Sequence, residues 1–389
     1  RRRGRPAELF ELHNILAVAN MHRSIRFRSD TLGRANLARL CTSRGLTRRA
    51  VVTRAAAKQQ VENLDEIDPI TGQPLSKAAL TSPVAGNAVK AGPHTWAYRV
   101  STPEAGKDAA DKPDVLLLHG LASSSYSYRN TLGLLGGDGY RAFAPDWLGH
   151  GDSDKPDPAT FGYAEQDYVA GLGAFVEAVG IRKPFALVVQ GFVLGQYGLL
   201  YALEHPDQIS RLLILNTPLA LNAKLRPELA VYKSPLPFLR PGNKTFDFMT
   251  YNMSGSPYAM AEKDALTYGR PSKEPAATVA VANTMDRVDF PKLLKKVDEG
   301  YLTWRKPSLC LFGPSDPFVE VGTAFEFLES KRTNMKCLTL AAKLGHMPQE
   351  DYPEALHEPM IKWLRGETDA DIKQGLLKMT KYGIVESKN

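Results

Sequence analysis

The chain has 389 residues, of which 43% are hydrophobic and 23% charged, and this composition is ordinary for a globular protein with room for a large α/β domain and an insertion. The net charge of +7 is unevenly distributed: residues 1–57 hold 13 Arg and three acids, and the remainder is slightly acidic. This charge distribution argues against nucleic-acid binding. The three cysteines form neither a disulfide framework nor a metal-binding spacing. No apolar run approaches the ~18 residues that a membrane-spanning helix needs.

Residues 1–57 have the composition of an organelle transit peptide. From Met21 onward the segment is rich in Arg, Ser and Thr and contains one acid, Asp30. We expect the mature protein to begin near 55–60 and to lie in the chloroplast stroma, with the mitochondrion as the alternative. Residues 1–20 are interpreted as upstream sequence, and a disordered basic tail is the alternative interpretation of the whole segment.

The chain then changes from polar to strongly patterned. Residues 58–92 are polar and broken by Pro and Gly, which indicates an N-terminal arm. In 93–219, apolar runs predict strands at 95–100, 115–118, 141–146, 185–189 and 212–216, and helical spacing predicts helices at 127–136 and 167–180. Strands that alternate with helices imply a doubly wound, mainly parallel sheet.

This alternation stops after Pro218 and later returns. Residues 220–303 contain scattered aromatics, several prolines and short helical patches, but no strand of the earlier kind. In 304–366 the pattern predicts strands at 308–312 and 337–340 and a helix at 353–365. An interruption followed by a return to the same sheet predicts an inserted helical cap, and 367–389 is expected to be a polar, helix-prone tail.

The strand at 185–189 runs directly into a tight turn and a helix rich in small residues. This arrangement resembles the nucleophile elbow of the α/β-hydrolase family, written G-x-S-x-G when the nucleophile is serine. Gly191 occupies the nucleophile position in that alignment. The run Val-Val-Gln-Gly-Phe at 188–192 is similar to that of haloalkane dehalogenases and epoxide hydrolases, which carry aspartate there. We therefore expect a vacant nucleophile position, at which glycine suits the strained backbone of the turn.

Two further motifs follow the family's order. His-Gly-Leu at 119–121 resembles its oxyanion motif, so the resemblance implies that the backbone N–H groups of Leu121 and Phe192 form an oxyanion hole. The run at 145–156 is similar to the family's P-D-x-x-G-x-G-x-S-x-x-P. Its histidine, His150, is expected to be an exposed turn residue, and the histidine at 119 a structural one.

The remaining family motifs lie in the C-terminal part. The turn Gly-Pro-Ser-Asp at 313–316 resembles the turn that carries the triad acid, and Gly-His at 345–346 resembles the loop that carries the triad histidine. The resemblance therefore assigns these roles to Asp316 and His346, since an acid beside an imidazole fixes its tautomer and makes it a competent base. Trp147 is expected to bind substrate, as is Tyr268 in the cap. Four serines after the oxyanion motif are expected to open a helix rather than to replace the nucleophile: Ser123, Ser124, Ser125 and Ser127.

The resemblance covers about 94–366, and runs at 145–149, 188–192 and 268–271 are similar to a plant and algal plastid branch of the dehalogenase and epoxide-hydrolase-like proteins. Three functions are open. The His-Asp pair could activate water against small esters, thioesters or lactones, the protein could bind a small apolar molecule without catalysis, or it could be a structural subunit. No cofactor, metal or nucleic acid is expected.

Overall fold

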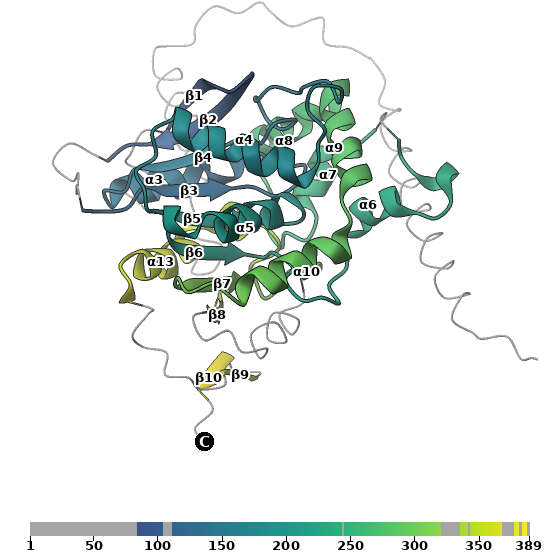
Figure 1. The fold of residues 1–389 in the computed structure, drawn as a ribbon. Helices are drawn as coiled ribbons and strands as arrows, with labels where there is room; N and C mark the ends of the chain where they lie inside the picture. Colours follow the sequence, from purple (N-terminus) through teal and green to yellow (C-terminus); the bar gives the residue numbers. More distant parts are fainter. Residues whose placement is uncertain are drawn as a thin grey trace, which may run out of the picture. The chain divides into compact units, whose positions relative to one another are not determined.

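The computed structural model describes residues 84–103, 111–242, 245–319, 335–340, 343–367, 377–380 and 383–386. The predicted transit peptide and most of the predicted N-terminal arm lie outside these residues. The described chain forms an eight-stranded sheet with helices packed on it (Figure 1). Within these ranges, no helix is both long and apolar enough to cross a membrane.

The sheet has the strand order β1-β2-β4-β3-β5-β6-β7-β8. Pairing is antiparallel between β1 and β2 and between β2 and β4, and parallel from β4 through β8. This order confirms the doubly wound, mainly parallel sheet that the sequence predicts. The strand bounds are β1 (Val84–Ala91), β2 (His94–Ser101), β3 (Val115–Leu118), β4 (Ala142–Pro145), β5 (Phe185–Gln190), β6 (Ile209–Leu215), β7 (Ser308–Phe312) and β8 (Met335–Thr339).

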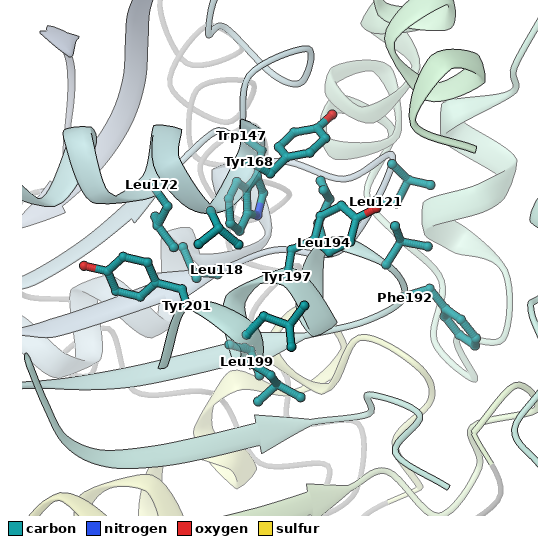
Figure 2. Close-up of a cluster of buried hydrophobic side chains, with 14 of the residues drawn as sticks. Leu118, Leu121, Trp147, Tyr168, Leu172, Phe192, Leu194, Tyr197, Leu199 and Tyr201 are labelled. Carbon is teal, nitrogen blue, oxygen red and sulfur yellow. The ribbon is translucent and has the colours of Figure 1, made fainter. Parts of the chain in front are cut away.

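Two hydrophobic layers form because successive residues of a strand face opposite sides of the sheet. In β5, Leu187 and Val189 belong to one cluster, whereas Ala186 and Val188 belong to the other. Residues of α4 (Glu165–Ala178), α5 (Leu194–Glu204) and α10 (Phe290–Tyr301) join the first cluster, and residues of α3 (Arg129–Gly137) and α13 (Pro353–Leu364) join the second. Figure 2 shows part of the first cluster, in which Leu172 of α4 and Tyr197 of α5 pack near Leu118 of β3.

Two predictions at the ends of the folded chain are wrong. The last residues of the predicted arm form β1, which pairs with β2 across a turn at Gly92, where φ is +61°. Most of β1 is exposed, so its sequence has little need of apolar alternation and backbone pairing carries the strand. In the tail, β9 (Leu377–Thr380) and β10 (Gly383–Glu386) form an antiparallel hairpin where helix is predicted.

The segment between β6 and β7 is helical in its described part. Before α10 it contains α6 (Pro227–Ala230), α7 (Phe248–Met253), α8 (Glu262–Gly269) and α9 (Pro275–Arg287), and these four helices are called the cap below. A partly buried ionic network joins the cap to the core. Arg129 of α3 pairs with Asp264 of α8 at 3.0 Å and with Glu350 of α12 (Pro348–Asp351) at 2.6 Å.

Candidate active site

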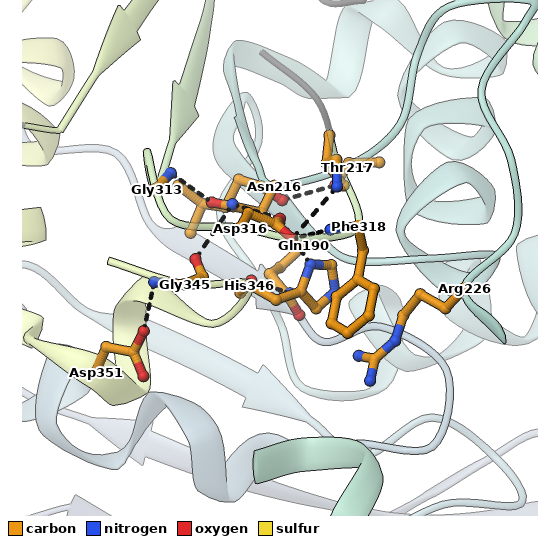
Figure 3. Close-up of polar contacts among 12 residues, drawn as sticks. Gln190, Asn216, Thr217, Arg226, Gly313, Asp316, Phe318, Gly345, His346 and Asp351 are labelled. Atoms are coloured by element: carbon orange, nitrogen blue, oxygen red, sulfur yellow. Dashed lines mark hydrogen bonds and ion pairs between the residues drawn. The ribbon is translucent and has the colours of Figure 1, made fainter. Parts of the chain in front are cut away.

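Asp316 and His346 lie side by side beyond the carboxyl ends of β7 and β8. His346 Nδ1 is 2.9 Å from Asp316 Oδ2 (Figure 3). Both side chains are almost completely buried: 4% of the His346 side chain and 0% of the Asp316 side chain is exposed. Donation from Nδ1–H to the carboxylate leaves Nε2 as the free acceptor of a neutral imidazole. The structure therefore brings together the two groups that the sequence assigns to a dyad.

Further donors hold the Asp316 carboxylate. Asn216, directly after β6, donates from Nδ2 to Oδ2 at 2.7 Å, and the Phe318 N–H donates to Oδ1 at 2.8 Å. Burial by itself raises the pKa of Asp316, but the neighbouring His346 and these donors outweigh it and hold the pKa below its ordinary value. An ionised Asp316 can stabilise the imidazolium that forms when His346 takes a proton.

The imidazole of His346 is fixed by its surroundings. The ring of Phe192 packs against it at a tilt, with a centroid distance of 5.4 Å, and the ring of Phe318 packs edge-on, with a centroid distance of 5.6 Å. Gln190 Nε2 donates to the His346 carbonyl at 3.0 Å, and the N–H of Gly345 donates to the Asp351 carboxylate at 2.7 Å. A base that is already held in place needs no rearrangement before it accepts a proton.

Gly191 lies opposite this imidazole, in the turn that follows β5. Its φ is +80°, a conformation that glycine adopts without cost. An ideal Cβ built on Gly191 would lie 3.6 Å from His346 Nε2 and 3.1 Å from Gly120 Cα. A side chain at position 191 would therefore point at the imidazole, and with glycine that space is open.

The predicted oxyanion hole is closed. The Leu121 N–H, expected to bind an oxyanion, donates instead to the Phe192 carbonyl at 3.0 Å. The same carbonyl accepts from the Leu194 N–H at 2.8 Å, which makes a γ-turn about Val193 (φ +62°, ψ −69°). The peptide between Phe192 and Val193 is thus oriented with its oxygen, rather than a donor, toward Leu121. The orientation of a single peptide leaves no signal in the sequence, so the prediction for Leu121 is wrong in this conformation.

A small recess lies over the dyad. Its cavity volume is about 10 Å³, which is room for about one water molecule and is small for a ligand site. Its polar walls come from His346, Gln190, Asn252 of the cap and Ser123 of the core. The sequence did not single out Asn252, and it assigned Ser123 to the start of a helix. The full lining is Gly120, Leu121, Ser123, Gln190, Gly191, Phe192, Tyr251, Asn252, His346 and Met347.

The two residues predicted to bind substrate lie elsewhere. Trp147 is fully buried, donates from its indole N–H to the His119 carbonyl at 3.0 Å and packs near Tyr168, so it is a core residue (Figure 2). Tyr268 donates its hydroxyl proton to Glu350 at 2.5 Å within the ionic network of Arg129. Neither residue lines the recess over the dyad, but Tyr268 lines a larger recess beside it.

Two further histidines are structural. His119 accepts from the Trp147 N–H through Nε2 and contacts the Gly120 carbonyl through Nδ1, as expected for a structural residue. His150 is 1% exposed, so the prediction of an exposed turn residue is wrong. Burial lowers the pKa of His119 to about 4 and that of His150 to about 3, and both rings are therefore neutral near pH 7.

Asn216 and Gln190 are the positioning residues that the sequence did not reveal. Each directly ends or follows a central strand, and that location was the only signal available for them. Asn216 has a left-handed backbone (φ +39°), which turns its amide toward Asp316. In the described part of the chain, no cluster of three or more His, Cys, Asp or Glu side chains could hold a metal ion.

Several proteins of known activity are similar to this chain in sequence. The cis-3-alkyl-4-alkyloxetan-2-one decarboxylase of Shewanella oneidensis is 36% identical over 103 residues, which are 26% of this chain and 32% of that protein. The match thus spans about a third of that relative's length. A haloalkane dehalogenase of Mycobacterium marinum is 28% identical over 284 residues, covering 65% of this chain and 85% of the dehalogenase.

The fold is shared with solved structures. The crystal structure of a haloalkane dehalogenase from Bradyrhizobium elkani matches with a TM-score of 0.61 at 23% identity, covering 75% of this chain and all of that one. A putative lipase from Acinetobacter baumannii matches with a TM-score of 0.58 at 18% identity, covering 85% of this chain and 99% of the lipase. Residues 115–358, well over half of the chain, match the Alpha/beta hydrolase family, and the chain therefore belongs to that family.

Proposed function

We propose that His346, oriented by Asp316, acts as a general base and activates water for the slow hydrolysis of small activated esters, thioesters or lactones. One relation carries the proposal: the Nε2 acceptor of His346 faces the position that a side chain of residue 191 would fill, and glycine leaves that position open. A water molecule there can give its proton to Nε2 while its oxygen attacks a carbonyl carbon. The acyl–oxygen bond, or the acyl–sulfur bond of a thioester, then breaks, and the leaving oxygen or sulfur takes the proton back from the imidazolium.

The missing side chain defines the reaction class. Without a nucleophile at Gly191, no ester intermediate can form on this residue, so the route through an enzyme-bound ester is closed. General-base catalysis typically contributes ~10²–10⁴-fold, which is enough for an activated acyl group and far too little for an amide. The name of the Shewanella relative supports the lactone class, because an oxetan-2-one is a four-membered lactone and ring strain activates its carbonyl. The proposed reaction requires no cofactor.

A second function is favoured by a different observation. The Leu121 N–H is bonded to the Phe192 carbonyl and is not available to an oxyanion in this conformation. Removal of one such donor typically costs ~10²–10³-fold in rate. A site in this state is suited to a non-catalytic binder of a small apolar molecule.

Hydrolysis of p-nitrophenyl acetate distinguishes the two functions. We expect the wild-type protein to release p-nitrophenol slowly and without a burst, and His346→Ala to lower this rate by ~10²-fold or more. Asp316→Asn should lower it as well, because the amide no longer favours the imidazolium. If the wild-type protein hydrolyses no ester and His346→Ala changes only ligand affinity, the proposed hydrolysis is refuted and the protein is a non-catalytic binder.

We also propose that the chain is a chloroplast stromal protein of the plastid branch that its motifs resemble. The Arg-rich, acid-poor composition of residues 21–57 supports this address. A fusion of residues 21–60 to a fluorescent protein should accumulate in the chloroplast. Fluorescence in the cytosol would refute the proposal, and import into mitochondria would favour the alternative address.

A further inference from the structure

A second and larger recess adjoins the one over the dyad. It lies between β2, the turn at 122–126 and the cap helices α7 and α8, and it is partly open to solvent. Ser123 and Asn252 line both recesses, so these side chains lie between the two spaces. The larger recess has a cavity volume of about 50 Å³, compared with about 10 Å³ for the recess over the dyad.

The walls of the larger recess present polar atoms that lack partners within the described structure. They are Ser123 Oγ, Asn252 Oδ1 and Arg99 Nε. Ser123 is 7% exposed and Asn252 4%. The Asn252 amide is not free to turn, because its Nδ2 donates to the carbonyls of Ala122 and Phe248 at 2.8 and 2.7 Å. Buried polar atoms are normally hydrogen-bonded, and leaving one unsatisfied costs ~1–3 kcal/mol, so this wall is suited to a polar ligand.

Arg99 gives the larger recess an unpaired positive charge. Its guanidinium carbon lies 5.1 Å from the centroid of the Tyr126 ring, and it makes no hydrogen bond or ion pair with the described residues. The other arginines nearby already have acids: Arg270 pairs with Asp152, and Arg129, on the same tyrosine ring, pairs with acids of α8 and α12. A guanidinium without an acid is complementary to a carboxylate, which it can bind through two parallel hydrogen bonds.

We propose that the larger recess binds the carboxylate of a small acid, with Arg99 as its counter-ion and the Ser123 hydroxyl as a further donor. The recess also contains the acids Asp146 and Asp152, which would repel a doubly charged phosphate more than a singly charged carboxylate. A ligand that places its carboxylate at Arg99 can extend past Ser123 and Asn252 toward His346. The substrate class of the dyad is then an ester or lactone that carries a free carboxylate, and this last step alone rests on the proposed function.

Binding of hexanoate tests the recess without any chemistry. We expect isothermal titration calorimetry to detect hexanoate binding to the wild-type protein and to His346→Ala, and to show hexanamide, its neutral analogue, binding at least about tenfold more weakly. Arg99→Gln should weaken hexanoate binding at least about tenfold and leave hexanamide unchanged. Arg99→Lys, which keeps the charge, should retain part of the affinity even if Arg99→Gln folds poorly.

Arg305→Gln is the matched control, because it removes one exposed arginine of the same charge outside the recess. Its hexanoate affinity should equal that of the wild-type protein. Equal binding of hexanoate and hexanamide, or hexanoate binding that survives Arg99→Gln, would overturn the inference. Hexanoate binding through Arg99 in a protein that hydrolyses no ester would uphold the carboxylate site and refute the proposed hydrolysis, so the two failures are distinguishable.

Discussion

Two neighbouring residues in the turn after β5 determine what the site can do. Gly191 leaves open the space in front of His346 Nε2, and Val193 adopts a φ of +62° that is unfavourable for a β-branched side chain. The γ-turn at Val193 keeps the Phe192 carbonyl on the Leu121 N–H. Position 191 thus lacks a side chain and the Leu121 N–H is already engaged, for separate reasons.

Restoring both groups should restore covalent catalysis. Gly191→Ser places a hydroxyl near His346 and should give a burst of p-nitrophenol from p-nitrophenyl acetate, because an acyl-enzyme then forms. The burst should be slow while the Leu121 N–H is engaged. Adding Val193→Pro excludes the γ-turn, because proline fixes φ near −65°, so the Phe192 carbonyl must leave the Leu121 N–H and we expect acylation to accelerate by up to ~10²–10³-fold.

Gly191→Ala/Val193→Pro is the control for this pair of substitutions, since it carries the same backbone changes without a hydroxyl and should show no burst. Serine at a φ of +80° costs on the order of 1–3 kcal/mol, so folding must be checked by circular dichroism. A folded double variant that acylates no faster than Gly191→Ser would show that the Phe192 carbonyl does not limit the reaction.

At the scale of elements, α12 connects the histidine loop to the cap. Asp351, its last residue, accepts from the Gly345 N–H at 2.7 Å and from the Ser256 hydroxyl at 2.5 Å. Burial raises the pKa of Asp351 to about 6, against the opposing effect of these two donors. The loop that carries His346 therefore depends on a carboxyl group that titrates in an accessible pH range.

Asp351 should make the protein less stable as pH rises. The unfolded chain loses this proton near pH 4, whereas the folded chain keeps it until about pH 6, so the free energy of unfolding falls across that window. The cost above pH 6 is on the order of 3 kcal/mol. Urea unfolding at pH 4.5 and 7.5 should show a larger loss in the wild-type protein than in Asp351→Asn. Asp207→Asn, which removes an exposed carboxyl group, is the control and should keep the wild-type pH dependence. A wild-type pH dependence in Asp351→Asn would contradict the assignment of the effect to Asp351.

At the scale of the whole molecule, the arrangement of the sheet could be predicted and its finer contacts could not. Apolar runs located the central strands, because buried strands leave strong patterns in sequence. The resemblance of two turns to motifs of the α/β-hydrolase family located Asp316 and His346, which lie 2.9 Å apart. The exposed strand β1 left almost no such pattern in the sequence. Tyr268 was assigned to substrate because a tyrosine in a cap gives no sign that Glu350, 82 residues later, will accept its proton.

The strand order also has a consequence for the growing chain on the ribosome. β6 pairs with β7, yet the segment 216–307 must be synthesised between them. At ~5–20 residues per second, the hydrogen-bonding edge of β6 waits roughly 5–20 s for its partner. During this interval the apolar strand is an unpaired edge of the kind that pairs with other chains. We expect nascent chains arrested before residue 308 to need a chaperone, and those extended through β8 to be released from it.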